Sequence, residues 1–189
     1  LAVAKNYYQL DFEAYAIAMF HPVTTEIDQM EVYAQNFVDA LLADHHNYLV
    51  VYPNNDLGSR LILKAYEALK GNPRFRIIPS LRFEYFLTLL KNSQFIIGNS
   101  SAGIREAPYY GIPIINIGTR QQNRAVHADI LHVDYQKAAI GAALDMIDIH
   151  KVNVGDSDFG QGNSAQLFLE CLQMTNFWQM NQQKQFRDL

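Results

Sequence analysis

Short apolar runs recur along the chain, and each is followed by a longer segment whose apolar residues repeat at helical spacing. An apolar run bounded by turn residues predicts a buried strand, whereas apolar repeats three and four residues apart predict one face of a helix. The predicted strands are residues 14–20, 48–52, 75–78, 95–97, 113–117 and 130–133. The predicted helices begin near Thr25, cover residues 56–70, 82–91 and 135–150, and include a short helix that ends at Gly111.

Strands that alternate with helices and are apolar throughout predict an α/β fold, in which a parallel sheet is flanked by helices. In such sheets, ligands bind beyond the carboxyl ends of the strands. The residues that follow the predicted strands are polar or include glycine, so we expect a binding site along this edge. These residues are His21-Pro22, Pro53-Asn54, Pro79-Ser80, the turn 98–103 and Gly118-Thr119-Arg120.

The segment FIIGNSSAGIRE, residues 95–106, joins a predicted strand to a predicted helix through a turn rich in glycine and serine. Free amides at a helix N-terminus favour an anion such as phosphate. Gly98 and Gly103 would let the backbone approach the anion, while Ser100 and Ser101 would donate hydroxyl hydrogen bonds. The pattern fits equally well a serine that only caps the helix. It matches neither the Walker A motif nor the dinucleotide-binding GxGxxG motif.

Three further side chains are candidates for ligand contact. Glu106 would either accept hydrogen bonds from a ribose diol or simply be stabilised by the helix N-terminus. Arg120 would either bridge to a phosphate or carboxylate, or remain a solvated loop arginine. His21 lies at the end of the first predicted strand, and this position favours ligand contact over a purely structural role.

The composition is that of a folded globular protein, since 49% of the 189 residues are hydrophobic and 18% are charged. A net charge of −4 without blocks of like charge disfavours a nucleic-acid-binding protein and a polybasic membrane protein. The single cysteine, Cys171, excludes an internal disulfide and fits a reducing compartment. No apolar run has the length of a membrane span, and no signal peptide is recognised. We therefore expect a cytoplasmic protein.

Metal and serine-hydrolase chemistry find no support in the motifs. The sequence contains no HExxH, no cysteine cluster and no GxSxG elbow. We therefore expect a site that uses neither a metal nor a cofactor.

Four segments together resemble the UDP-N-acetylglucosamine 2-epimerase family. They are FHPVTTE (20–26), VYPNNDLGS (51–59), IPSLRFEYFLTLLKNS (78–93) and GNSSAGIREAPYYGIPIINIGTRQ (98–121). The match spans residues 21–124, and FGQGNSA (159–165) is similar to the family's tail. The motifs look most like the hydrolysing branch, which feeds the synthesis of sialic acid and related nonulosonates.

The resemblance covers only the C-terminal half of the family's enzymes. Those enzymes have two Rossmann-like domains that face each other across a cleft, as in glycosyltransferase-B proteins. It therefore implies that residues 1–175 are the UDP-binding Rossmann-like domain and that residues 176–189 are a helical tail. The N-terminal domain would be absent from this chain, which begins at Leu1 and is interpreted as the back half of a longer protein. A homodimer is implied for the full-length protein.

The family pattern also implies roles for individual residues. Ser100 and Ser101, with Gly103 and nearby amides, would hold the diphosphate of UDP. Glu106 would hold the ribose hydroxyls. Asn54 would lie beside the nucleotide, whereas Ser80 stands where some family members have a histidine near the nucleotide. His21 and Arg120 would contact the substrate, and His21 is the candidate catalytic residue of this half.

The implied reaction converts UDP-N-acetylglucosamine and water to N-acetylmannosamine and UDP through a glycal intermediate. The main acid/base carboxylates would belong to the missing domain, so this chain alone is expected to be inactive. Hydrolysing and reversible epimerases share these motifs, and a related diacetamido sugar is a possible substrate. Two other functions fit the pattern: the donor-binding half of a glycosyltransferase-B transferase, and a stand-alone nucleotide-sugar-binding module.

Overall fold

The computed structural model describes residues 1–124, 130–147, 160 and 162–179. Contacts along the chain divide it into two compact units, Leu1–Asp156 and Ser157–Leu189. The sequence places the end of the first domain later, at residue 175. The difference arises because α7 (Ser164–Gln173) has no buried residue and packs against α8 (Thr175–Trp178), so it groups with the second unit.

The first unit is built on a six-stranded parallel sheet with the strand order β3-β2-β1-β4-β5-β6. The predicted parallel α/β sheet is thereby confirmed, and the runs 75–78 and 130–133 coincide with strands. The strands are β1 (Ala16–Met19), β2 (Tyr48–Val51), β3 (Phe75–Ile78), β4 (Ile96–Gly98), β5 (Ile114–Ile117) and β6 (Ile130–Val133).

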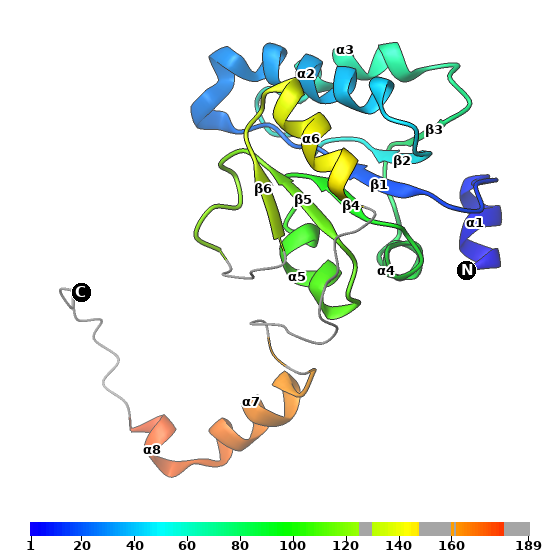
Figure 1. Cartoon of the computed structure of the whole chain (residues 1–189). Helices are drawn as coiled ribbons and strands as arrows, with labels where there is room; N and C mark the ends of the chain where they lie inside the picture. Colours follow the sequence, from blue (N-terminus) through cyan, green and yellow to red (C-terminus); the bar gives the residue numbers. More distant parts are fainter. Residues whose placement is uncertain (125–129, 148–159, 161, 180–189) are drawn as a thin grey trace. The chain divides into compact units, whose positions relative to one another are not determined.

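Helices cover both faces of this sheet. Successive residues of each strand point to opposite faces, so an apolar strand presents apolar side chains on both faces, and each face is buried under helices. Ala16 and Ala18 of β1 belong to one hydrophobic cluster, and Ile17 between them belongs to the other. The helices of the first cluster are α2 (Met30–Ala43), α3 (Ser59–Tyr66) and α6 (Lys137–Ile147). Those of the second are α1 (Ala2–Tyr8), α4 (Phe83–Lys91) and α5 (Ala102–Tyr109) (Figure 1). None of the helices in the described ranges is long and apolar enough to cross a membrane.

The helix α1 was not predicted, because its stability comes from distant contacts rather than from a local pattern. The hydroxyl of Tyr8 accepts a hydrogen bond from the amide of Arg82 at 2.9 Å, and its carbonyl accepts one from Nε of Arg76 at 2.8 Å. The helix predicted from Thr25 begins instead as a 3-10 segment, Thr24–Gln29, before α2. A second 3-10 segment, Glu67–Leu69, follows α3.

The strand order sets where a ligand would bind. The chain runs from β1 outward through β2 and β3, then returns to the other side of β1 for β4, β5 and β6. This change of direction between β1 and β4 is the topological switch point at which α/β sheets bind ligands. The strand order brings the residues after β1, β2, β4 and β5 side by side. The residues after β3 lie apart from them, because β3 is the outermost strand on its side of the sheet.

We expect Gly98→Ala to destabilise the fold, because a Cβ at this position would lie 2.0 Å from the main-chain oxygen of Met19. Gly98 also has a φ of +133°, which side chains rarely tolerate. The expected loss in unfolding free energy is about 3 kcal/mol, measured by urea-induced unfolding of the chain.

The matched control is Gly141→Ala in α6, where a Cβ would meet nothing within 4 Å. Alanine favours a helix over glycine by about 0.5–1 kcal/mol, so this variant should be slightly stabilised. A Gly98→Ala chain as stable as the wild type would contradict the close approach of β1 and β4.

Candidate functional site

Asn99, the first residue after β4, is completely buried at the switch point. Its side-chain Oδ1 accepts a hydrogen bond from the amide of His21 at 2.7 Å, and its Nδ2 donates to the carbonyl of His21 at 2.8 Å. The amide of Asn99 also donates to the carbonyl of Met19 at 3.1 Å. These three bonds join the end of β4 to the end of β1.

The carbonyl of Asn99 connects the loop after β5 to the same point. It accepts hydrogen bonds from Nη1 of Arg120 at 3.1 Å and from Nε2 of Gln121 at 2.9 Å. The predicted site residues His21 and Arg120 are thus brought together through Asn99. The sequence assigned no role to Asn99 or Gln121, and their burial beside strand ends is visible only in the folded chain.

The imidazole of His21 is buried and hydrogen-bonded through one nitrogen. Its Nδ1 accepts a hydrogen bond from the main-chain amide of Asn54 at 3.1 Å. A neutral ring that accepts at Nδ1 carries its proton on Nε2. The pKa of His21 is lowered to about 4, mainly by burial and also by the charge of Arg120, and Asp56 partly opposes both. At neutral pH, His21 is therefore an uncharged hydrogen-bond donor.

Asn54 contributes to the site mainly through its backbone. Its side-chain Nδ2 donates to Oδ2 of Asp56 at 2.5 Å. Its Oδ1 is buried and has no hydrogen-bond partner among the described residues. An acceptor left unpaired in this way favours binding of a ligand that supplies an N–H or O–H group.

The serine turn before α5 is more closed than the sequence predicts. Ser101 is the N-cap residue, yet its hydroxyl makes no capping hydrogen bond. The amides of Gly103 and Ile104 already donate to the carbonyls of Ser100 and Ser101, at 3.1 and 3.0 Å. The amide of Ala102 donates to Oγ of Ser100 at 3.3 Å. The expected row of free helix amides is thus largely occupied, and the hydroxyls are the turn's main remaining donors.

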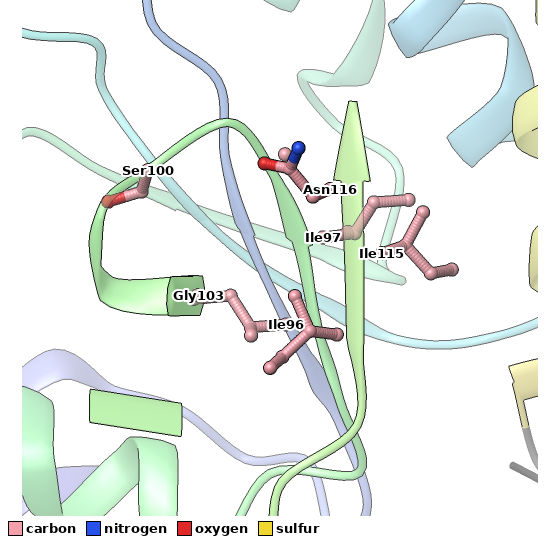
Figure 2. A pocket seen from close by; sticks show the side chains of 8 residues that line it. Ile96, Ile97, Ser100, Gly103, Ile115 and Asn116 are labelled. Atoms are coloured by element: carbon pink, nitrogen blue, oxygen red, sulfur yellow. The ribbon is translucent and has the colours of Figure 1, made fainter. Parts of the chain in front are cut away.

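A small cavity lies behind this turn, between β4 and β5. Figure 2 shows isoleucine side chains of both strands gathered beside Gly103, with Ser100 and Asn116 also in the lining. Its volume is about 10 Å³, which is roughly the space of one water molecule. This cavity is therefore too small to hold a phosphate.

The loop that carries Arg120 is fixed by two neighbouring segments. The hydroxyl of Thr119 donates to Oε1 of Glu26 at 2.6 Å, and its amide donates to the hydroxyl of Tyr135 at 3.2 Å. Gly118, with a φ of +70°, leaves space that the ring of Tyr135 fills. Arg120 itself borders an open polar hollow of about 300 Å³. The other residues around the hollow are Pro22, Val23, Thr24, Thr25, Asp56 and Thr119.

Glu106 lies half-buried on α5 with one carboxylate oxygen unused. Burial raises its pKa, because the charged form is less well solvated there. Its Oε2 is buried and lacks a hydrogen-bond partner within the described ranges. Two hydroxyl groups of a ribose would satisfy this carboxylate and stabilise its charge.

Ser80 is not brought together with the other predicted residues. It is exposed and follows β3, the edge strand, with β2 lying between β3 and β1. No hydrogen bond of its side chain is found in the described part of the chain, so its contact with a nucleotide stays a prediction.

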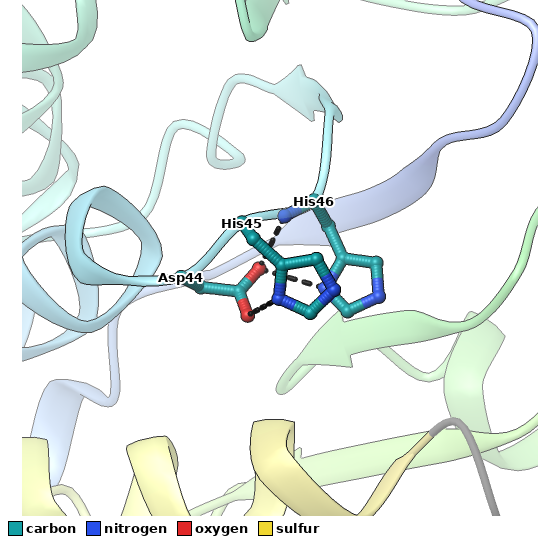
Figure 3. A group of neighbouring side chains, drawn as sticks. All are labelled: Asp44, His45 and His46. Atoms are coloured by element: carbon teal, nitrogen blue, oxygen red, sulfur yellow. Dashed lines mark hydrogen bonds and ion pairs between the residues drawn. The ribbon is translucent and has the colours of Figure 1, made fainter.

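A second group of titratable side chains lies at the amino ends of the strands, between α2 and β2. Ligand-type atoms of Asp44, His45 and His46 lie within 4.8 Å of one another (Figure 3). The Asp44 carboxylate is 2.8 Å from Nδ1 of His46 and accepts a hydrogen bond from the Tyr48 hydroxyl at 2.6 Å. Burial alone would raise the pKa of Asp44, but the hydrogen bonds of Tyr48 and His46 outweigh it and lower the pKa. The cluster does not have an HExxH spacing, and its hydrogen bonds indicate a role in shaping the loop between α2 and β2.

Comparison with known sequences identifies similar proteins. A family model described as UDP-N-acetylglucosamine 2-epimerase matches residues 2–173. A UDP-N-acetylglucosamine 2-epimerase of Neisseria meningitidis serogroup B is 44% identical over 193 residues, covering 100% of this chain and 51% of the relative. A hydrolysing UDP-N,N'-diacetylbacillosamine 2-epimerase of Legionella pneumophila is 30% identical, covering 84% and 41%. The chain spans about half the length, or less, of the curated relatives it matches.

Solved structures show the same fold. A Methanocaldococcus jannaschii UDP-GlcNAc 2-epimerase in complex with UDP-GlcNAc and UDP superposes with a TM-score of 0.71 at 20% identity, over 91% of this chain and 48% of that one. An Escherichia coli ADP-heptose heptosyltransferase II gives a TM-score of 0.57 at 10% identity, over 78% and 50%. At these identities the likeness concerns the fold alone, and it confirms the expected half of a glycosyltransferase-B-like architecture.

We expect His21 to make the stability of the chain depend on pH. In the unfolded chain the imidazole takes up a proton near pH 6.5, whereas in the folded chain it does so only near pH 4. The unfolding free energy should therefore fall as the pH drops from about 6.5 to about 4, by about 3 kcal/mol in total. Urea-induced unfolding at a series of pH values measures this loss.

The matched variant is His21→Asn, whose side-chain oxygen can replace Nδ1 as the acceptor for the Asn54 amide but does not titrate. Its pH profile should lack the His21 contribution and keep those of the other groups. Parallel profiles for the wild type and the variant would show that His21 is not held neutral by the fold.

Proposed function

Because the chain belongs to the UDP-N-acetylglucosamine 2-epimerase family, we propose that it is the UDP-sugar-binding half of a hydrolysing 2-epimerase. The full-length protein would convert UDP-N-acetylglucosamine and water to N-acetylmannosamine and UDP. The observation that carries the proposal is the meeting of the β1, β4 and β5 ends at Asn99. This meeting sets His21, Ser100 and Arg120 around one edge of the sheet.

The hydrogen-bond donors at the carboxyl ends of the strands suit the diphosphate of UDP. Ser100 and Ser101 offer hydroxyls, Arg120 offers the rest of its guanidinium, and the neutral ring of His21 offers Nε2–H. Charge-assisted hydrogen bonds to phosphate oxygens are stronger than those between neutral groups. These four side chains would therefore hold the phosphates of UDP.

The unpaired acceptors suit the remainder of the ligand. The free oxygen of Glu106 would accept from the ribose hydroxyls, and Oδ1 of Asn54 would accept from a group beside the nucleotide. Ser80 is left outside this set, because it lies beyond the edge strand. The contacts of each residue with UDP are proposals that binding experiments decide.

In the proposed reaction this half of the protein stabilises the leaving group. Loss of the C2 proton and cleavage of the C1–O bond give a glycal and UDP, and negative charge develops on the β-phosphate as that bond breaks. Hydrogen-bond donors that are already aimed at this oxygen lower the transition-state free energy. Water then adds across the glycal, with the proton at C2 and the hydroxyl at C1, to give N-acetylmannosamine.

His21 serves this reaction as a donor and not as the base that removes the C2 proton. Its Nδ1 is occupied by the Asn54 amide, its Nε2 carries a proton, and burial keeps its pKa near 4. A general base works best with a pKa near the operating pH. The C2 base would therefore come from the other half of the full-length protein.

Two names among the relatives support the hydrolysing, sialic-acid-related assignment. The Legionella relative is named a hydrolysing epimerase, and an E. coli relative, 31% identical over 128 residues, is named polysialic acid biosynthesis protein P7. We therefore propose that the product enters sialic-acid-type sugar synthesis. A cytoplasmic location is proposed from the sequence, on its single cysteine and its lack of an apolar run of membrane length. A homodimer of the full-length protein completes the proposal.

Incubation with UDP-N-acetylglucosamine in the absence of an acceptor tests this function. The full-length protein should release N-acetylmannosamine and UDP in equal amounts, whereas the 189-residue chain should bind UDP without turnover, because the base for the C2 proton is proposed to lie in the other half. Free UDP and N-acetylmannosamine are assayed over hours, and UDP binding by calorimetry. A transferase would release little sugar without an acceptor, and a chain that turned over substrate would overturn this division of roles.

Glu106→Gln is expected to weaken UDP binding by about 1–3 kcal/mol, because the amide accepts ribose hydrogen bonds through one oxygen and without charge. Calorimetry with UDP and with its 2′,3′-dideoxy analogue separates ribose recognition from helix stabilisation. The variant should lose much less affinity for the dideoxy analogue than for UDP. Equal losses for the two ligands would show that Glu106 does not contact the ribose.

A further inference from the structure

We propose that Asn99 is a positioning residue of the nucleotide site, whose side-chain amide sets the place of His21. The inference rests on the proposed binding of UDP. It adds Asn99 as a residue that affects the ligand by holding His21 in place. Asn99 is completely buried, and both ends of its amide are hydrogen-bonded to the main chain of His21.

The Asn99 side chain extends the pairing of β1 and β4 past the ends of the strands. The register of the two strands ends with Met19 opposite Gly98. Gly98 then adopts a φ of +133°, which turns the chain out of the strand direction. Beyond this point the side-chain amide of Asn99 takes the place of a backbone peptide, with one acceptor for the His21 N–H and one donor for its carbonyl.

The backbone and the ring of His21 are thereby held by different neighbours. Asn99, after β4, holds the backbone, and the amide of Asn54, after β2, holds Nδ1 at 3.1 Å. Together they fix the direction in which Nε2–H points. A residue without a side-chain amide at position 99 would leave two buried main-chain groups unpaired and release this constraint.

The contacts of Asn99 with the next loop are made by its backbone and survive a change of side chain. Its carbonyl accepts from Arg120 at 3.1 Å and from Gln121 at 2.9 Å. Side-chain variants of Asn99 therefore alter the hold on His21 and leave these two bonds available. This separation makes the inference testable by a double-mutant cycle.

The cycle compares UDP affinity, measured by calorimetry, in the wild type, Asn99→Ala, His21→Ala and the double variant. Loss of the aligned His21 donor should raise the Kd about tenfold in Asn99→Ala, the equivalent of one hydrogen bond. In the His21→Ala background, Asn99→Ala should change the Kd by less than about twofold. Equal fold-changes in the two backgrounds would overturn the proposal.

Ser93→Ala is the matched control, because Ser93 is also buried and its hydroxyl donates to the carbonyl of Leu90 at 2.8 Å, at the other end of β4. It should lower stability without changing the Kd for UDP. The ¹⁵N shifts of the His21 ring provide a readout without ligand: they should move in Asn99→Ala and stay in place in Ser93→Ala. Unmoved shifts in Asn99→Ala would also overturn the proposal.

Two outcomes separate this inference from the proposed function. If the wild-type chain does not bind UDP, the proposed function of the chain fails, and the ring shifts still decide whether Asn99 positions His21. If Asn99→Ala does not fold, the wild-type chain provides the test through NMR detection of the Nδ2–H···O=C bond to His21. Rapid solvent exchange of the Asn99 side-chain amide and absence of that bond would overturn the proposal.

Discussion

Two hydrogen bonds between the Asn99 amide and the main chain of His21 hold together the strand ends on which the site is built. Parallel strands end in unpaired main-chain groups, and a buried unpaired group costs about 1–3 kcal/mol. Asn99 removes this cost at the switch point and, through its carbonyl, also ties in the loop of Arg120. The same contacts that stabilise the sheet edge therefore determine the geometry of the site.

This arrangement also fixes the charge state of the site. Because His21 is buried next to Arg120, its protonated form is disfavoured and its pKa lies near 4. The site at neutral pH therefore has a neutral donor in His21 and a permanent cation in Arg120. The proposed diphosphate ligand would therefore meet one fixed cation in this pair, so its binding should vary little through His21 and Arg120 between about pH 6 and 8.

Much of the fold was predictable because its signals are local. Strands buried on both faces are continuous apolar runs, and the polar residues after β1, β2, β4 and β5 marked the edge where His21, Asn54, Ser100 and Arg120 lie. Residues whose role depends on distant partners were not predictable. An asparagine after a glycine is typical of an ordinary turn, and only the fold shows that Asn99 faces His21, 78 positions away. The helix α1 escaped prediction for the same reason, since Tyr8 is held by Arg76 and Arg82.

The polar atoms left unpaired in the fold indicate which chemical groups a ligand of the proposed site would need. Among the described residues that follow β1, β2, β4 and β5, four buried side-chain oxygens lack a hydrogen-bond partner: Glu26 Oε2, Asn54 Oδ1, Glu106 Oε2 and Gln121 Oε1. They are acceptors, so they favour hydroxyl and N–H groups, whereas Ser100, Ser101, Arg120 and His21 offer donors to an anion. The UDP-sugar proposed as ligand combines a diphosphate with sugar hydroxyls and amide N–H groups, so it would offer partners to both sets.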